Sequence, residues 1–159
     1  MRFILSALAG AVLVVSAVSA DDGLISVKSG YAVDQTLDRF ERAARDKGMT
    51  VFARIDHAAG AAKVDKVLRP TELLIFGNPK AGTPLMQSRQ TVAIDLPMKA
   101  LAWADSEGQV WLTYNDPGYL VQRHDITDRD PLVEKMRRVL GELSAAATAT
   151  VPQAPAKLQ

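Results

Sequence analysis

The sequence predicts an α+β fold in which an antiparallel sheet is backed by helices. Three observations support this class. Short segments alternate apolar and polar residues, two longer segments carry apolar residues at helical spacing, and turn residues such as Gly, Asn, Asp and Pro separate them. The predicted order of elements is β-α-β-β-β-β-α, with short helices inserted.

The first strand and the first helix follow one another near the start of the folded region. Residues 24–31, LISVKSGY, form a short alternating segment that is broken at Gly30. Residues 33–48 change to a helical period, and Gly48 is a stop signal. The apolar residues that define the buried face of this helix are Val33, Leu37, Phe40 and Ala44.

Two more strands are expected before the middle of the chain. Residues 49–57 return to period two. One face of this strand is predicted to carry Val51, Ala53 and Ile55. Residues 58–68 are rich in alanine and polar residues, which predicts a short helix or an ordered loop. Residues 71–77, TELLIFG, then predict a buried strand.

A β-hairpin is predicted over residues 98–115, where two alternating runs flank a turn at 105–108. A four-residue turn would place Trp103 opposite Val110 and would put Trp111 on the other face, opposite alanines. Both faces of the hairpin would then be apolar. We therefore expect helices to cover one face and a loop or a second subunit to cover the other.

Three helix starts are indicated by a capping residue followed directly by proline. These pairs are Thr83-Pro84, Asp116-Pro117 and Asp130-Pro131. The first two helices are predicted to be short, whereas the third is long and amphipathic. Its apolar stripe consists of Leu132, Met136, Val139, Leu140 and Leu143.

The chain divides into a signal peptide, one domain and a tail. Residues 1–20 begin with the basic Arg2, continue as an apolar and small run and end in Val-Ser-Ala, which predicts cleavage after Ala20 and a periplasmic or secreted protein. The apolar run is shorter than the roughly 20 residues of a membrane-spanning helix, so no stable membrane anchor is expected after cleavage. Residues 21–146 form a single domain, and 147–159 are predicted to be a disordered tail.

Composition excludes several classes of function. The full sequence holds 19 Lys and Arg and 18 Asp and Glu, and loss of Arg2 with the signal peptide balances the charges. No basic stripe interrupts this balance, so we expect no nucleic-acid binding. The absence of cysteine excludes disulfides, a thiolate nucleophile and Cys-ligated metal. No serine lies in a Gly-x-Ser-x-Gly motif, which disfavours a hydrolase of that type.

Four segments together resemble the bacterial family called Domain of Unknown Function 302. They occur in the order FARIDHAAGAAKV, LRPTELLIFGNPKAGTPLMQ, DLPMKALAWAD and VWLTYNDPGYLVQRH. The resemblance covers roughly Leu24 to Leu143. It implies a compact α+β fold similar to the TATA-binding-protein-like fold, often as a homodimer, and it implies no reaction. One departure is Ala32, where relatives tend to carry Ser at the head of the first helix.

The segment Gly77-Asn78-Pro79 has two interpretations. The first is a well-formed turn, because Gly tolerates many backbone conformations, Asn bonds its own backbone and Pro excludes a helical Asn78. The second is a binding loop, in which Lys80 and backbone amides offer donors to an anionic ligand. No P-loop spacing supports a specific phosphate site.

The two histidines have structural and functional interpretations as well. His57 and His124 each lie beside an acidic residue, and together they could bind a transition metal or act in general acid-base chemistry. Met86 could join them in a copper(I) site, although such a methionine is more often core filler. Their separation of 67 positions favours structural roles, so we predict no metal, no cofactor and no catalytic residue.

A candidate ligand pocket remains at the strand ends. Tyr114 and Asn115 lie at a strand-to-helix junction, where polar groups collect at the edge of a sheet. The candidate ligand-binding residues are His57, Asn78, Lys80, Tyr114 and Asn115. The predicted function is an uncharacterised periplasmic small-ligand-binding or accessory protein, with a small-molecule ligand and a homodimer as partners. The alternatives are a dimeric scaffold without a pocket, and a metal-dependent or general-base enzyme that uses His57.

Overall fold

The computed structural model describes residues 18–19 and 23–149. Apart from Val18–Ser19, the predicted signal peptide lies outside the described residues, as does the predicted tail beyond residue 149. Among the helices of the described residues, none is long and apolar enough to span a bilayer. The predicted α+β class with an antiparallel sheet is confirmed.

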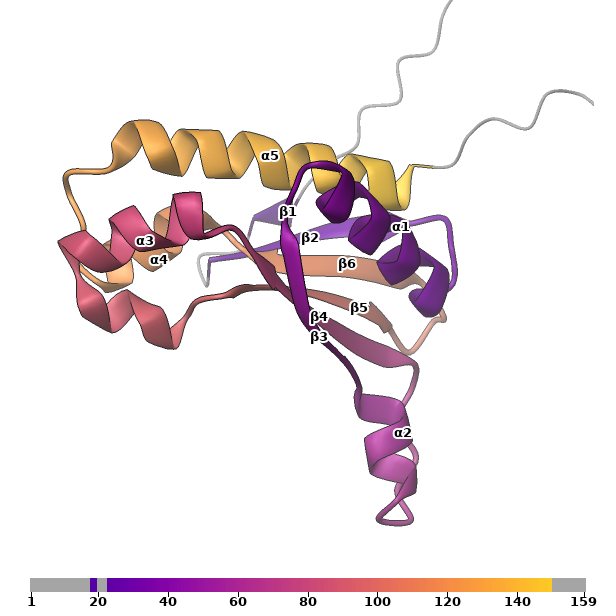
Figure 1. Ribbon diagram of the computed structural model, residues 1–159. Helices are drawn as coiled ribbons and strands as arrows, with labels where there is room; N and C mark the ends of the chain where they lie inside the picture. The colour runs from indigo at the N-terminus through magenta and orange to yellow at the C-terminus, as the bar shows by residue number, and fades with distance from the viewer. Residues whose placement is uncertain (1–17, 20–22, 150–159) are drawn as a thin grey trace, which may run out of the picture.

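The sheet runs in the order β1-β2-β6-β5-β4-β3, and every neighbouring pair is antiparallel (Figure 1). Its strands are β1 Val18–Ser19, β2 Leu24–Ser29, β3 Thr50–Asp56, β4 Thr71–Gly77, β5 Met98–Ala104 and β6 Val110–Asn115. The last five are the predicted strands. β1 is an additional short strand that pairs with β2, and the predicted cleavage after Ala20 would remove it.

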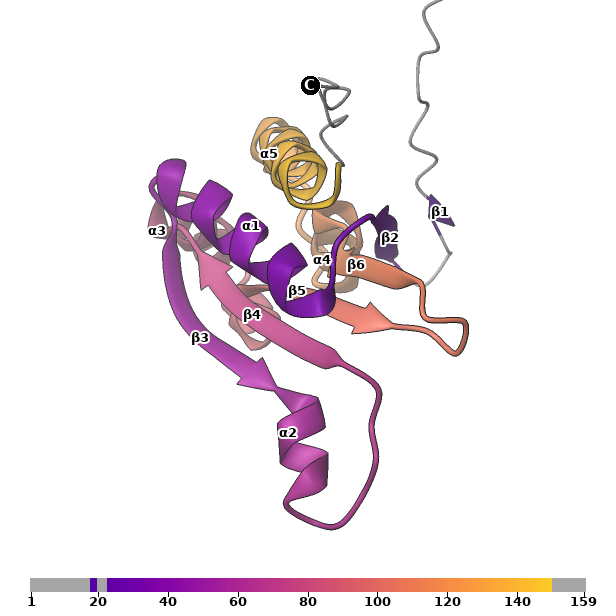
Figure 2. The ribbon, with the colours of Figure 1, turned by 90° about the vertical axis from the view of Figure 1, so that its right-hand side faces the viewer.

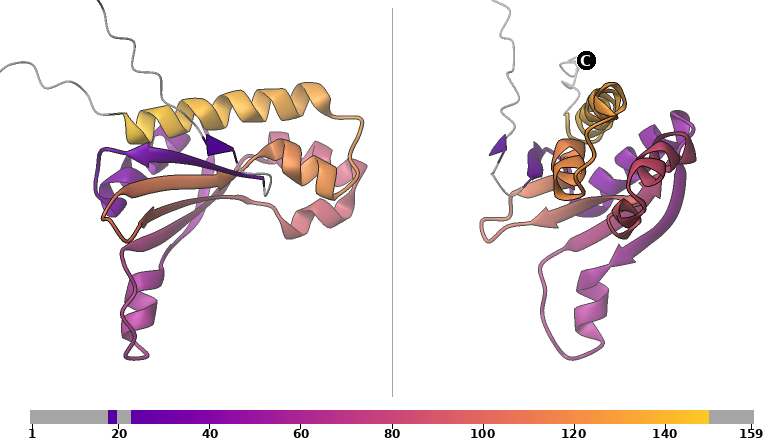
Figure 3. Two further views of the ribbon diagram at one scale, coloured as in Figure 1. Left: turned by 180° about the vertical axis from the view of Figure 1, so that it is seen from behind. Right: turned by 90° about the vertical axis from the view of Figure 1, so that its left-hand side faces the viewer.

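The helices form a layer on one face of the sheet and a cluster at one end. They are α1 Val33–Asp46, α2 His57–Ala62, α3 Pro79–Ser88, the 3-10 helix η1 Gln90–Ile94, α4 Pro117–Arg123 and α5 Asp130–Thr148. Helices α1 and α5 lie over the same face (Figure 2), which we call the inner face, and we call the opposite one the outer face. Helices α3 and α4 gather beyond one end of the strands, whereas α2 projects from the other end (Figure 3).

The core lies between α1, α5 and the inner face, as the stripe on α1 predicts. Leu37 and Phe40 are fully buried, and the Phe40 ring meets the edge of Phe76 on β4 at a centroid distance of 5.0 Å. α5 contributes Leu140 and Leu143 to the same core. It continues to Thr148, two residues past the predicted domain boundary, because Ala147 is also buried. Burial of these apolar side chains is the main force that holds the helices on the sheet.

The predicted register of the β5–β6 hairpin is wrong by one residue. Trp103 pairs with Trp111 instead of Val110, because the connection contains five residues instead of four. The Asp105 carboxylate accepts hydrogen bonds from the backbone N–H of Glu107 and Gln109, which stabilises the longer loop. A one-residue shift moves side chains to the other face. Both tryptophans therefore lie on the outer face, with ring centroids 6.5 Å apart.

The predicted faces of β3 also need a correction. Val51 pairs with Phe76, but Ala53 pairs with Ile75, so a β-bulge at this point inserts an extra residue. Val51 therefore packs against the inner-face core, while Ala53 and Ile55 share the face of Ile75. The same shift turns the Arg54 guanidinium toward α1, where it donates to the Asp38 carboxylate. Burial acts to lower the pKa of Arg54, but its hydrogen bonds to the Asp38 and Glu72 carboxylates, together with their charges, outweigh burial and raise that pKa.

Candidate functional site

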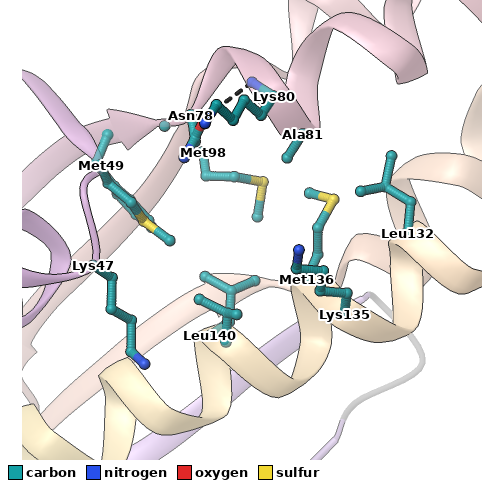
Figure 4. A pocket seen from close by; sticks show the side chains of 13 residues that line it. Lys47, Met49, Asn78, Lys80, Ala81, Met98, Leu132, Lys135, Met136 and Leu140 are labelled. Atoms are coloured by element: carbon teal, nitrogen blue, oxygen red, sulfur yellow. Dashed lines mark hydrogen bonds between the residues drawn. The ribbon is translucent and has the colours of Figure 1, made fainter.

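A pocket of about 380 Å³ lies where the end of β4, the first turn of α3 and the side of α5 meet. We call it the methionine pocket, because Met49, Met98 and Met136 line it from three separate segments of the chain (Figure 4). Met49 follows the turn after α1, Met98 begins β5 and Met136 lies on α5. Thioether side chains are flexible and polarizable, so such a surface adapts to apolar ligands of different shape.

The α5 stripe explains why this pocket exists. The sequence predicts a continuous apolar face, but the sheet supports only part of it. Leu143 packs into the core, Leu140 belongs to both the core and the pocket wall, and Leu132 and Met136 lie farther toward α3 and line the pocket. The stripe is therefore shared between the core and the pocket.

Three lysines also line the methionine pocket, and no Asp or Glu does. Lys47 is paired with Glu142, since its Nζ lies 2.6 Å from a carboxylate oxygen of that residue. Within residues 23–149, the ammonium groups of Lys80 and Lys135 take part in no ion pair. These two lysines belong to α3 and α5, so positive charge comes from two walls.

A second hollow of about 310 Å³ lies on the other side of the first turn of α3. The lining residues that it shares with the methionine pocket are Gly77, Asn78, Ala81, Met98 and Met136. The rest of its lining includes Phe52 and Met86, and no charged residue. The two spaces thus adjoin one another at the start of α3 and are bordered by the same two methionines.

Asn78 bonds the nearby backbone and is not helical, as the first interpretation of Gly77-Asn78-Pro79 predicts, but it caps α3 and so begins a helix instead of closing a turn. Its side-chain oxygen accepts a hydrogen bond from the Lys80 backbone N–H at 2.9 Å, and Pro79 occupies the first helical position. The predicted helix start at Thr83-Pro84 is wrong, because Pro84 lies inside α3. The upstream Asn-Pro pair begins the helix one turn earlier and thereby positions Lys80 and Ala81 at the pocket.

The structure does not bring the five predicted site residues together. Asn78 and Lys80 line the methionine pocket, but His57 is exposed at the start of α2, at the opposite end of the β3–β4 pair. Adjacent antiparallel strands have their carboxyl ends at opposite ends of the pair, so the residues that follow β3 and β4 do not meet. Tyr114 is buried in the inner-face core, and Asn115 pairs with Leu24. The prediction that they share one pocket is therefore wrong.

Tyr114 and Asp116 have structural roles. Burial raises the pKa of Tyr114, and the nearby Asp116 carboxylate adds to this shift. Burial also acts to raise the pKa of Asp116, but hydrogen bonds from Arg137 and the Gly118 backbone outweigh it and lower that pKa. Asp116 caps α4 as predicted, since its carboxylate accepts the Gly118 N–H at 2.8 Å.

The structural interpretation of His124 is confirmed. Its Nε2 lies 2.6 Å from a carboxylate oxygen of Asp95, and its Nδ1 lies 3.2 Å from the Thr91 hydroxyl. Both ring nitrogens are thus engaged. In the described part of the chain, no group of three or more His, Cys, Asp or Glu side chains could hold a metal ion. His57 and His124 therefore do not form the copper(I) site with Met86 that the sequence left as an alternative.

Sequence reasoning missed Lys47, Met49, Met98, Lys135 and Met136. A partial signal exists in the composition, because every methionine in residues 23–149 borders the methionine pocket or the second hollow. Their spacing along the chain is irregular, however, and only the folded arrangement brings them together.

Comparison with known proteins identifies the family. The sequence model described as "Domain of unknown function DUF302" matches residues 25–143. The chain belongs to the DUF302 family. A solved structure of an uncharacterized conserved DUF302 protein from Bacillus stearothermophilus has a TM-score of 0.71 at 15% sequence identity. That match covers 79% of this chain and 98% of the other, and it supports the same DUF302 fold.

Curated relatives of this DUF302 chain are found in Brucella. A protein named "Fluoride-specific ion channel FluC 1" from Brucella suis biovar 1 is 52% identical over 106 residues, which are 67% of this chain and 42% of that protein. A protein of the same name from Brucella abortus biovar 1 is also 52% identical, with 39% of its length covered. The chain thus spans about two-fifths of the length of these relatives.

Proposed function

We propose that this chain is a small-ligand-binding or accessory protein that holds its ligand in the methionine pocket. The observation that carries the proposal is a pocket of about 380 Å³ with a mainly apolar lining and a few polar groups. Small-molecule sites in proteins typically have this size and character. The relatives' name describes whole proteins of which this chain covers 42% or less, so no channel activity enters the proposal.

The proposed place of action is the periplasm or the extracellular space. The support is the apolar segment of residues 1–20 with its Val-Ser-Ala end. Processing after Ala20 would leave the methionine pocket intact, since its lining begins at Lys47.

Native mass spectrometry can detect a bound ligand whose identity is still to be determined. Untagged protein isolated from its own cells is expected to carry an additional mass that denaturation releases, because the pocket contacts a small molecule on several sides. The same protein produced in unrelated cells should acquire the same additional mass when it is mixed with a small-molecule extract of its native host. Protein that carries no added mass under either condition would contradict the proposal.

We also propose that two copies associate through the outer face of the sheet. Among the described residues, α1 and α5 lie over the inner face and leave the outer face without a comparable layer of helices (Figure 2). The outer face carries Trp103 and Trp111. At the edge of the sheet, Ile55 is 39% exposed and Phe52 is 56% exposed. A second copy would bring the same apolar residues to this face, which suits a self-complementary twofold contact.

Sedimentation equilibrium provides the test of this dimer. Unmodified protein is expected to reach twice the chain mass at high micromolar concentration, and Ile55→Glu is expected to return it to one chain mass, because a buried carboxylate without a partner opposes association. Ala145→Glu is the matched control, since Ala145 is exposed on α5, which lies over the opposite, inner face. A single-chain mass for the unmodified protein would refute the dimer.

A further inference from the structure

We infer that the ligand of the methionine pocket is an amphipathic anion, with one anionic head and an aliphatic tail. The inference rests on the proposed function, because it names the class of molecule that the same pocket would bind. It follows from the distribution of charge at the pocket and from the continuation of its apolar surface into the second hollow.

The charge at the pocket selects an anionic head. Lys80 and Lys135 approach from α3 and α5 (Figure 4), and neither has an ion-pair partner among the side chains that the structure describes. Lys47 is already neutralised by Glu142. No carboxylate lines the pocket, so a carboxylate or phosphate head would meet two ammonium groups and no like charge.

The apolar surface can accommodate an aliphatic tail that extends beyond the methionine pocket. Figure 4 shows the thioether side chains of Met49, Met98 and Met136 projecting into one space. Met98 and Met136 also border the second hollow, which has no charged lining residue. A tail that passes these two methionines therefore stays in contact with apolar side chains and avoids water.

A metal cation suits this pocket less well. Thioethers are ligands for copper(I). The same space, however, faces the ammonium groups of Lys80 and Lys135, which oppose the approach of any cation. His57 lies at the other end of the sheet and His124 is held by Asp95, so no imidazole assists.

The methionines provide a direct readout of binding. Four of the five methionines lie in residues 23–149, and all four border the methionine pocket or the second hollow. Protein labelled with 13C at the methionine methyl groups is titrated with decanoate and, separately, with decyltrimethylammonium, both below their micellar concentrations. The two probes have the same aliphatic chain and opposite head charges. Decanoate is expected to shift the pocket methyl signals and to bind about tenfold more tightly than the cation.

The double variant Lys80→Gln, Lys135→Gln tests the origin of this preference. It is expected to bind the two probes with nearly equal affinity, because the tail contacts remain while the unpaired charges are gone. Lys66→Gln is the matched control, since Lys66 is an exposed lysine in the loop after α2 and lines neither space. The control should retain the full preference for decanoate, and thermal melting verifies that each variant is folded.

The outcomes separate the inference from the proposed function. If neither probe shifts any methionine signal, the inferred amphipathic anion is wrong, whereas the proposed function is decided separately by the native mass spectrum. If the unmodified protein binds both probes equally, the ligand site stands and the inferred anion is wrong. A decanoate preference that survives in the double variant would also overturn the inference, because its stated cause would then be absent.

Discussion

Replacement of Phe40 by alanine is expected to destabilise the fold by about 3–5 kcal/mol, since it removes a large buried ring and leaves a cavity. The Phe40 side chain is fully buried and packs edge-on against Phe76 at 5.0 Å. This contact attaches α1 to β4 at the centre of the inner face. Typical domains are stable by only about 5–15 kcal/mol, so the expected loss is a large part of the total.

Urea denaturation followed by tryptophan fluorescence measures this loss. Phe52→Ala is the matched control, because the same atoms are removed from a side chain that is 56% exposed. We expect that control to cost less than about 1 kcal/mol. Equal losses for the two variants would mean that α1 does not depend on the Phe40 contact and would contradict the described core.

Ala81→Trp is expected to weaken decanoate binding by at least about tenfold, because the larger ring would occupy space that the tail needs. Ala81 is half-buried in the first turn of α3 and borders both the methionine pocket and the second hollow. The free energy of unfolding should change by less than about 1.5 kcal/mol, since flexible methionine side chains can adjust around the ring.

The methionine-methyl titration and a melting curve measure the two effects of Ala81→Trp separately. Ala59→Trp serves as the control, since Ala59 is exposed on α2 at the opposite end of the sheet. Decanoate affinity should be unchanged in that control. An unchanged affinity in Ala81→Trp would place the binding site elsewhere on the protein.

Most of the fold could be predicted because the spacing of apolar residues along each helix and strand is a local property of the sequence. The spacing of Leu37, Phe40 and Ala44 repeats along a helix, and this stripe can be recognised without reference to distant residues. The hairpin register depends instead on one residue. Hydrogen bonds to the Asp105 carboxylate stabilise a five-residue connection. Neither these bonds nor the bulge near Phe52 changes the alternation of apolar and polar residues in the sequence.

The candidate site could be predicted only where residues that are close together in the sequence form it. Asn78 and Lys80 follow a buried strand directly, so the sequence places them at its end. The grouping of His57 with Asn78 required the relative direction of β3 and β4, which the residues themselves do not state. The methionine pocket combines side chains from the turn after α1, from β5 and from α5, and therefore depends on tertiary packing.

The bulge in β3 also affects how copies of the chain can assemble. Within residues 23–149, β3 pairs with β4 on one side only, so its other side is an open edge that could recruit another strand. The extra residue at Phe52 interrupts the regular row of backbone donors and acceptors along this edge. Strand-by-strand growth into a fibre along this edge is thereby discouraged.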